Sequence, residues 1–399
     1  MKPIILFVGF SRRDYLQSLK KNPVFAEYDF VCAFSREIKH HSHNGYLREF
    51  SQALNMNKTG DRAQLKALKD TIKAVTCTQE NDIQLYIETL HNLERISDSQ
   101  KNLYRKLIDK SAFKTELLTI SANLTPKTQI VSAGFEPDSF PLVIKPLGFS
   151  GSKYVEIISS KKELDVYFSK NGSITSTTQC IAEEFLVGPQ YSLNVYVDKQ
   201  GKTTFCPLTR VIPAFELGHT DTYSAIQYTT NELTAQEMTR LATIINLIVQ
   251  HFQVQSCTLH FDLIKNTDTF KVIEVGMRIG GLREELFSRS SEFSHISNDV
   301  LNRLGITVTT PPLKRYVSMI QKGAHEPGHL EEITHPQKIN STAVFTDKIF
   351  PQETFVKPVH SGGTVVYRGI ITAEKEPEVV SDSLALFNEV NVAIRSEAV

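Results

Sequence analysis

The sequence has few cysteines, and none of them forms a recognisable pair. Five are scattered through 399 residues with no C-x-x-C spacing, and an odd number cannot all pair within one chain. They are Cys32, Cys77, Cys180, Cys206 and Cys257. This usage argues against a disulfide framework and predicts reduced, buried thiols in a cytoplasmic protein.

An excess of one charge sign is also missing. Lys plus Arg and Asp plus Glu number 44 each, so the whole chain carries no electrostatic signal for nucleic acid or an anionic membrane. No apolar run approaches the roughly 18 residues of a membrane span, and the short run Ile4 to Val8 precedes two arginines rather than a cleavage site. We therefore expect a soluble protein of about two or three structural units, without nucleic-acid or membrane partners.

What the sequence does contain is a hairpin pattern with two acids. Strand-like runs at 259–264 and 270–275 flank the polar break Asn266 to Thr269. If the turn centres near Asp268, Asp262 lies opposite Glu274 with Cβ atoms about 5 Å apart. Facing carboxylates repel unless a cation lies between them, and oxygen ligands suit Mg²⁺ that carries phosphates. The hairpin predicts a metal-nucleotide platform; two solvated surface acids are the alternative.

A second pattern combines a lysine with a Gly/Ser loop. An apolar strand ends at Lys145, the loop Gly148 to Ser152 follows, and a further strand comes next. Glycine removes the Cβ obstacle, so backbone N–H groups can approach phosphate oxygens, and the lysine adds a positive charge. The spacing does not satisfy G-x-x-x-x-G-K-[ST], so an ordinary Walker-type NTPase is not supported. A simple turn between strands is the alternative.

A third segment, 180–194, predicts a strand, a turn at Gly188-Pro189 and another strand. In this order the three segments resemble the ATP-grasp superfamily, from about Asp109 to Gly281. The resemblance implies an α/β protein with α+β lobes that binds ATP between them and activates a carboxylate as an acyl phosphate. It implies a Rossmann-like domain at 1–108, an ATP-grasp core at 109–304 with a mobile lid at about 125–188, and a C-terminal lobe at 305–399.

The resemblance also implies roles for individual residues toward ATP and Mg²⁺. In the segment Asp109 to Lys114, the candidate for the first nucleotide lysine is Lys114. The remaining assignments are Lys145 at the α- and β-phosphates, Ser150, Gly151 and Ser152 in the phosphate-covering loop, Glu183 near the adenine amino group, the backbones of Glu184 and Leu186 at adenine, Gln190 at the ribose, Asp262 and Glu274 at two Mg²⁺ ions, and Arg278 at the transferred phosphate.

Two positions depart from the common family pattern. Many relatives carry a glutamate where this chain has Gln190, which keeps an acceptor oxygen but loses the charge. Many have an asparagine that completes the metal shell where this chain has Gly276, and water or another acid could replace it. The pattern Glu-x-Gly-x-Arg-x-Gly-Gly resembles a branch related to L-amino-acid ligases and carbamoyl-phosphate-synthetase-like ligases. We interpret both departures as specific to that branch.

The loop between Arg210 and Tyr228 is the candidate substrate-recognition segment, because loops on a rigid scaffold commonly carry recognition. The resemblance to L-amino-acid ligases implies that Glu216 and His219 meet the substrates, with His219 helping to remove the amine proton; a surface loop with incidental charge is the alternative. Arginines suit a substrate carboxylate because their planar guanidinium binds it bidentately. The remaining substrate candidates are Arg210, Arg278, Arg283 and Gly280.

From this resemblance we interpret the chain as an ATP-dependent carboxylate-amine ligase that forms an amide or peptide bond through an acyl phosphate. It would join small-molecule carboxylate and amine substrates, such as amino acids or other small metabolites, and release ADP and phosphate. A bicarbonate-activating carboxylase-like enzyme and a non-catalytic ATP-binding regulatory protein stay as alternatives. A homodimer is one option for the assembly.

Several structural expectations accompany this reading. Thr234 with Glu237 has the capping-box form and predicts a helix that packs against the sheet carrying the acids. The histidine-rich segment Lys39 to His43 is expected to be an exposed loop rather than a metal site. Residues 61–105 have a polar, helix-rich pattern, 284–304 are expected to be helical, and runs near 317–320 and 363–371 are expected to be strands.

Overall fold

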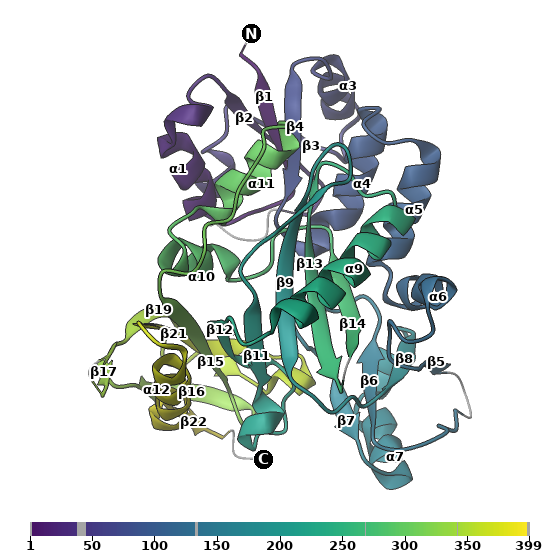
Figure 1. Cartoon of the computed structure of the whole chain (residues 1–399). Coiled ribbons are helices and arrows are strands. Elements are labelled where there is room, and N and C mark those ends of the chain that lie inside the picture. The colour runs from purple at the N-terminus through teal and green to yellow at the C-terminus, as the bar shows by residue number, and fades with distance from the viewer. Residues whose placement is uncertain (1, 38–44, 132–134, 268, 341, 397–399) are drawn as a thin grey trace.

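The structure is a computed structural model that describes residues 2–37, 45–131, 135–267, 269–340 and 342–396 (Figure 1). The histidine-rich segment Lys39 to His43 lies outside these ranges, and so does Asp268 of the expected turn, so the expectations for these residues are not tested. All five cysteines are buried and free, which agrees with reduced thiols. Among the described residues, no helix is long and apolar enough to cross a bilayer.

The N-terminal part is a four-stranded parallel sheet of order β3-β2-β1-β4 with helices around it. Its strands are β1 (Ile4–Val8), β2 (Asp29–Phe34), β3 (Gln52–Asn55) and β4 (Ile72–Cys77). Strand β1 is buried along its whole length, as expected for a parallel strand covered on both faces. The helices are α1 (Arg13–Lys21), η1 (Pro23–Phe25), α3 (Thr59–Ala67), η2 (Glu80–Asp82), α4 (Ile83–Asn92) and α5 (Asp98–Ile108). The region 61–105 is helix-rich as expected, but it also contains β4.

A large antiparallel sheet forms the centre of the molecule, in the order β14-β13-β9-β11-β12-β15-β21-β19 with β10 paired to β9. Its strands are β9 (Gln190–Val197), β10 (Thr203–Phe205), β11 (Thr209–Pro213), β12 (Ser224–Thr229), β13 (Cys257–Asn266), β14 (Thr269–Gly276), β15 (Tyr316–Gly323), β19 (Phe345–Ile349) and β21 (Val365–Ala373). Helices α6 (Lys110–Ile120) and α9 (Ala235–His251) lie beside the β13–β14 end (Figure 1). The expected capping box of Thr234 and Glu237 begins α9, whose apolar face packs into the same core as the strands.

A smaller antiparallel sheet of order β5-β8-β6-β7 projects beside β14 (Figure 1). Its elements are β5 (Thr128–Val131), β6 (Leu142–Pro146), β7 (Glu156–Ile158), α7 (Lys161–Lys170), α8 (Gly172–Thr175) and β8 (Cys180–Glu184). This sheet has its own small core, which includes Leu164 and Tyr167 from α7. The strand, turn and strand expected across Gly188-Pro189 are confirmed as β8 and β9, and the turn joins the small sheet to the central one.

The C-terminal region extends the central sheet instead of folding entirely apart from it. Strand β15 pairs with β12 and β21 pairs with β15, which confirms the two expected strands. The expected helical stretch 284–304 is two helices, α10 (Arg283–Ser290) and α11 (His295–Arg303). The other elements are η3 (Ala214–Leu217), β16 (Gly328–Thr334), β17 (Lys338–Ile339), β18 (Thr342–Ala343), β20 (Phe355–Val356), η4 (Val359–Ser361), α12 (Glu376–Glu389) and β22 (Asn391–Arg395).

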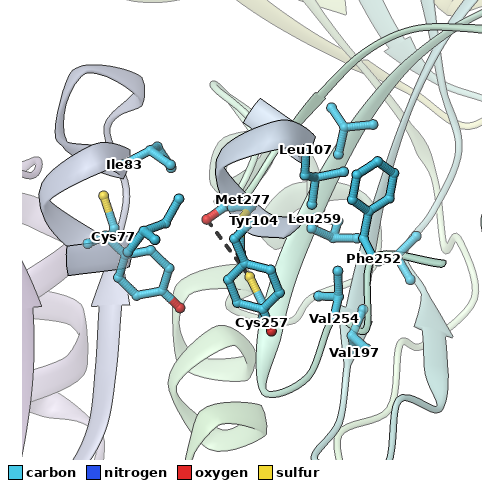
Figure 2. Packing of buried hydrophobic residues seen from close by; sticks show 14 of the residues in the cluster. Cys77, Ile83, Tyr104, Leu107, Val197, Phe252, Val254, Cys257, Leu259 and Met277 are labelled. Carbon is cyan, nitrogen blue, oxygen red and sulfur yellow. Dashed lines mark hydrogen bonds between the residues drawn. The ribbon is translucent and has the colours of Figure 1, made fainter. Parts of the chain in front are cut away.

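The N-terminal sheet and the central sheet share one continuous hydrophobic cluster (Figure 2). Figure 2 shows Tyr104 of α5 beside Cys257 and Met277 at the central sheet, with Cys77 and Ile83 on the N-terminal side of the cluster. A buried polar contact reinforces this interface: Asp299 accepts hydrogen bonds from Thr76 of β4 at 2.6 Å and from Thr258 of β13 at 2.5 Å. The two parts are thus joined by both apolar packing and a carboxylate.

Candidate active site

The candidate site is a cavity of about 480 Å³ between the small sheet and the β13–β14 end of the central sheet. Strand β6, the loop after it, the β8–β9 connection and the hairpin all contribute to its walls. Twelve residues that the sequence singled out line it: Lys145, Ser150, Gly151, Ser152, Glu183, Glu184, Leu186, Gln190, Arg210, Glu216, Asp262 and Glu274. Side chains from segments distant in sequence therefore meet in one cleft.

The hairpin register confirms the expected pairing of the two acids. Asp262 on β13 lies directly opposite Glu274 on β14, and a register shift follows at Leu263. Lys110 of α6 contacts Glu274, with Nζ 2.5 Å from Oε1. Partial burial in the cleft, together with the facing Glu274, raises the pKa of Asp262 to about 6. Burial also acts to raise the pKa of Glu274, but the Lys110 ammonium holds it below its ordinary value.

The donor set fits a cation that carries other ligands of its own. Among the described residues, no group of three or more His, Cys, Asp or Glu side chains is arranged to hold a metal ion. Asp262 and Glu274 supply two hard oxygen donors, and their mutual repulsion favours a cation between them. Mg²⁺ is commonly bound by one or two carboxylates, with phosphate and water oxygens completing its shell.

Glu183 joins two lysines on the opposite wall. Its carboxylate lies 2.5 Å from Lys145 Nζ and 3.4 Å from Lys114 Nζ, and only 3% of its side chain is exposed. Burial acts to raise the pKa of Glu183, but the two ammonium groups hold it below its ordinary value. Lys145, on β6, is the more exposed of the two lysines and borders the cavity.

The two lysines of α6 have different surroundings, and this bears on the choice of Lys114 from sequence. Lys114 is 3% exposed and donates hydrogen bonds from Nζ to the carbonyls of Val272 at 3.0 Å and Ile273 at 2.6 Å. It does not line the cavity, whereas Lys110, one helical turn earlier, does. Burial lowers the pKa of Lys114. Lys114 thus lies buried between β14 and Glu183, while Lys110 presents its ammonium to the cleft.

The connection from β8 to β9 passes very close to the hairpin. A Cβ at Gly188 would lie 2.0 Å from the carbonyl oxygen of Lys265, and the residue has φ +149, so only glycine fits there. Lys265 also donates its backbone N–H to Pro189 O at 2.9 Å. Gln190 begins β9, and its carbonyl accepts a hydrogen bond from Arg210 Nη1 at 2.9 Å. These contacts fix the connection across the mouth of the cavity.

The Gly/Ser loop is held by few contacts. Ser152 Oγ donates to Thr222 O at 3.4 Å, and among the described residues this is the one hydrogen bond that the side chains of Ser150 and Ser152 make. Gly148 and Gly151 have positive φ values of 83 and 69, where glycine is unstrained. Tyr154, after the loop, lies against the C-terminal region, because a Cβ at Gly362 would be 2.3 Å from its hydroxyl oxygen. The loop therefore bridges the cavity from β6 toward the C-terminal region.

The substrate candidates are only partly brought together. Glu216, in η3, borders the cavity, and burial raises its pKa. His219 does not border it: its ring packs against Phe387 with centroids 5.1 Å apart, and burial lowers its pKa. The cavity instead includes Phe215 and Thr222 from the same loop, which sequence reasoning did not single out.

Arg278 and Gly280 are not among the residues that line the cavity. Arg278 Nε donates to Glu80 of η2 at 2.7 Å, and its Nη1 donates to Ile279 O at 2.9 Å. A Cβ at Gly276 would lie 3.3 Å from Glu80 Oε2, so this carboxylate from the N-terminal part stands where a side chain at 276 would project. Glu80 thus places a carboxylate oxygen beside Gly276, the position where many relatives carry an asparagine.

A family model described as an ATP-grasp domain matches residues 138–285, the stretch that holds most of this cavity. The chain carries an ATP-grasp domain. The match begins before β6 and ends after Arg283, so it contains the Gly/Ser loop, the β8–β9 connection and the acid hairpin. No curated protein sequence matches the chain significantly.

Solved structures with the same ATP-grasp architecture align over nearly the whole chain. An L-amino acid ligase from Bacillus licheniformis is 14% identical, with a TM-score of 0.74, over 99% of this chain and 100% of that one. N5-carboxyaminoimidazole synthetase from Staphylococcus aureus, complexed with ADP, is 16% identical, with a TM-score of 0.66, over 97% and 98%. The biotin carboxylase domain of 2-oxoglutarate carboxylase from Hydrogenobacter thermophilus, with MgADP and bicarbonate, is 10% identical, with a TM-score of 0.62, over 99% and 91%. At these identities the likeness establishes the ATP-grasp fold.

One residue was missed although its motif was noticed. Lys110 belongs to the segment Asp109 to Lys114, and Asp109 caps α6 by accepting from Ser111 N and Ala112 N. Being at the first helical position, Lys110 points its side chain from the end of α6 toward Glu274. The helix-capping residue Asp109 directly before Lys110 was the signal that the sequence offered. Choosing between Lys110 and Lys114 as the lysine that faces the cavity also requires the position of α6 against β14.

Proposed function

We propose that this protein is an ATP-dependent carboxylate-amine ligase that forms an amide or peptide bond through an acyl phosphate and releases ADP and phosphate. The observation that carries the proposal is the meeting of the Asp262–Glu274 pair with Lys110 and Lys145 in one cavity. Two acids suited to a metal and two ammonium groups are the charges that a transferred phosphoryl group requires. The ATP-grasp fold supports the same chemistry, because the neighbours named above include ligases and structures with bound ADP.

ATP would occupy the cavity between the small sheet and the hairpin. The backbones of Glu184 and Leu186 would form hydrogen bonds with the adenine, and the side-chain oxygen of Gln190 would accept a hydrogen bond from a ribose hydroxyl. Lys145 and Lys110 would meet the phosphates, with the loop 150–152 above them. Lys114, buried between β14 and Glu183, would act on the site indirectly by positioning Glu183 and the strand.

Asp262 and Glu274 would hold Mg²⁺, and we expect two ions. The bound Mg²⁺ would neutralise negative charge on the phosphates. The described protein residues supply only these two carboxylates, so phosphate and water oxygens would complete the coordination. Glu274 also contacts Lys110, so a bound cation would compete with that ammonium and free it to meet a phosphate.

The reaction follows in two steps. A substrate carboxylate oxygen attacks the γ-phosphorus of ATP, the bond to the bridging oxygen breaks, and ADP leaves with that electron pair. The amine nitrogen then attacks the carbonyl carbon of the acyl phosphate, loses a proton, and expels phosphate that retains the oxygen from the carboxylate. Lys110 and Lys145 would neutralise charge in the first step, and closure of the loop 150–152 would keep water from the acyl phosphate.

Glu216 and Arg210 are the proposed substrate contacts on the cavity wall. A carboxylate on the cavity wall such as Glu216 suits a substrate ammonium group, whereas Arg210 suits a carboxylate. His219, Arg278 and Gly280 stay in the proposal as residues of the outer substrate region, since none of them borders the cavity. The domain division at 1–108, 109–304 and 305–399, with a lid at about 125–188, also stays a proposal.

The direct test is phosphate release from MgATP by the purified protein. Pooled amino acids, other small carboxylates and bicarbonate are supplied in separate reactions, with and without an amine. We expect ADP and phosphate in equal amounts in the amino-acid reactions, and a product whose mass equals two substrates minus water. Release that depends on bicarbonate alone would instead favour a carboxylase-like enzyme. If ATP binds but none of the reactions releases phosphate, the ligase proposal is contradicted.

A further inference from the structure

A histidine lies on the acid hairpin itself, next to Asp262. His260 precedes Asp262 by two residues on β13, so both side chains project from the same face of the sheet. Its Nε2 lies 3.6 Å from Asp262 Oδ1, and 12% of its side chain is exposed. His260 does not line the cavity. Any effect of His260 on the cavity therefore passes through the carboxylate of Asp262 beside it.

A hydrogen-bond chain behind His260 fixes which ring nitrogen carries the proton. The backbone N–H of Gly280 donates to Asn194 Oδ1 at 2.8 Å, and a backbone N–H has only the donor role. That contact identifies Oδ1 as the acceptor end of the amide, so Asn194 Nδ2 is the donor end. Nδ2 lies 3.3 Å from His260 Nδ1, which must then be a bare acceptor. The proton of the neutral ring is left on Nε2, the nitrogen facing Asp262.

The chain continues away from the site in the same direction. His295 Nε2 lies 3.2 Å from Asn194 Oδ1 and acts as a donor to it, which leaves His295 Nδ1 to accept from the Tyr196 hydroxyl. His295 is fully buried and Tyr196 nearly so. Ser192 Oγ lies 3.4 Å from both nitrogens of His260, so it favours neither tautomer. Each described contact is consistent with donors that point from Tyr196 toward Asp262.

The neighbouring glycine provides the space for this ring. A Cβ at Gly280 would lie 2.4 Å from His260 Nδ1 and 2.6 Å from its Cε1. A larger residue would push the imidazole away from its place beside the strand. Gly280 thus has two structural duties, since its N–H orients Asn194 and its missing side chain admits His260.

We propose that His260 is a positioning residue for Asp262, the proposed metal acid: its Nε2–H, which Asn194 and Gly280 orient, faces the carboxylate at 3.6 Å and would close to a hydrogen bond when Asp262 turns to bind the cation. This inference rests on the proposed function, in which Asp262 binds Mg²⁺. Carboxylates that bind metals are themselves held by hydrogen bonds, and removal of such an outer partner typically weakens metal binding by about 10- to 100-fold. Because Nε2 carries a proton, His260 does not itself bind the cation.

The first test measures Mn²⁺ binding in the presence of ADP, counting free Mn²⁺ by electron paramagnetic resonance. His260→Leu should raise the Mn²⁺ dissociation constant by about 10- to 100-fold. His260→Gln places an N–H donor near the position of Nε2 and should stay within about threefold of the parent protein. His91→Leu, on the surface helix α4, is the matched control and should change nothing. ADP binding measured without metal should be the same in all four proteins.

The outcomes separate this inference from the proposed function. If the parent protein fails to bind Mn²⁺ with ADP, the proposed function fails. If the parent binds and folded His260→Leu binds equally well, only the role of His260 is overturned. Equal losses in the Leu and Gln variants, both folded by their urea midpoints, would also overturn it, because the N–H donor would then not matter.

The second test determines the tautomer of His260 in the metal-free parent protein. It uses a variant only to assign the NMR signals, so it does not depend on the His260→Leu variant folding. Histidine labelled with ¹⁵N is observed by NMR, and the His260 signals are identified by their absence from His260→Gln. We expect a bare Nδ1 and a protonated Nε2. A proton on Nδ1, whether alone or on both nitrogens, would overturn the chain. Mn²⁺ coupled to a ring nitrogen of His260 would overturn the positioning role in favour of direct coordination.

Discussion

The two walls of the cavity are built very differently. The hairpin wall belongs to the large central sheet, where β13 pairs with β9 from Cys257 to Ile264 and with β14 from His260 to Asn266. It shares the core that runs into the N-terminal part. The phosphate-loop wall belongs to the four-stranded sheet, with a small core of its own. Its Gly/Ser loop is held to the rest of the chain by contacts such as Ser152 to Thr222 at 3.4 Å.

This difference indicates how the work is divided. Asp262 and Glu274, the proposed metal acids, are held by the strand register of the hairpin, and Glu274 also contacts Lys110. The Gly/Ser loop, which we propose covers the phosphates, has few interactions to lose, so it can move at low cost in free energy. A rigid acid wall facing a loosely held loop suits an enzyme that must admit ATP and then exclude water.

The largest expected effect comes from the rigid wall. Glu274→Ala should lower MgATP-dependent phosphate release by at least about 100-fold, because it removes one of two donors for the metal. The free energy of unfolding should change by less than about 1 kcal/mol, since loss of the Lys110 contact is offset by relief of the repulsion with Asp262. Steady-state kinetics and urea denaturation measure the two quantities. Glu292→Ala at the surface is the control, and full activity in Glu274→Ala would refute the metal assignment.

On the opposite wall, Lys145→Ala should weaken ADP binding by roughly 30-fold, as a charged contact to phosphate contributes about 1.5–3 kcal/mol. Glu183 then retains only Lys114, so some loss of stability is expected as well. Calorimetric titration with ADP measures the affinity, and Lys170→Ala on α7 serves as the control. Unchanged affinity would mean that the cleft binds phosphates on its acid side alone.

The two α6 lysines offer a sharper contrast within one helix. Lys110→Met should weaken ADP binding by about 10-fold with little loss of stability, whereas Lys114→Met should lower the free energy of unfolding by about 3 kcal/mol. The reason is that Lys110 faces the cavity and Lys114 is buried against two carbonyls and Glu183. Titration and urea denaturation of both variants check this. The reverse pattern would restore Lys114 as the nucleotide lysine.

The smallest effect is expected at the ribose. Gln190→Glu should strengthen ATP binding by about threefold, because a carboxylate accepts hydrogen bonds from hydroxyls more strongly than an amide does. Competition between ATP and a ribose-lacking polyphosphate would show whether the gain comes from the ribose. A weaker affinity in the variant would place Gln190 away from the ribose hydroxyls.

Features that depend on local pattern could be predicted from sequence. The pairing of Asp262 with Glu274 was predicted from a turn centred near Asp268, whereas in the structure it arises through a register shift between Asp262 and Leu263 that the sequence did not reveal. The capping box located the start of α9. The strand that ends in Lys145 and the turn at Gly188 were equally local. Such features need only the spacing of residues along one or two neighbouring elements.

Features that depend on packing between distant segments could not be predicted. The choice between Lys110 and Lys114 depends on how α6 rotates against β14. Glu80 reaches Arg278 and the space beside Gly276 only because the N-terminal part packs on the central sheet. His219 lies on a loop whose turn directs its ring to Phe387 of α12 instead of the cavity. Each case requires a tertiary contact that no local spacing encodes.

The most direct test of the account follows the carboxylate oxygen. Amino acids with ¹⁸O in their carboxylates are incubated with MgATP and the protein, and the released phosphate is analysed by mass spectrometry. Attack of the carboxylate on the γ-phosphate predicts one ¹⁸O atom in each phosphate, with ADP as the other nucleotide product. Phosphate without ¹⁸O, or AMP and pyrophosphate in place of ADP and phosphate, would contradict the acyl-phosphate mechanism.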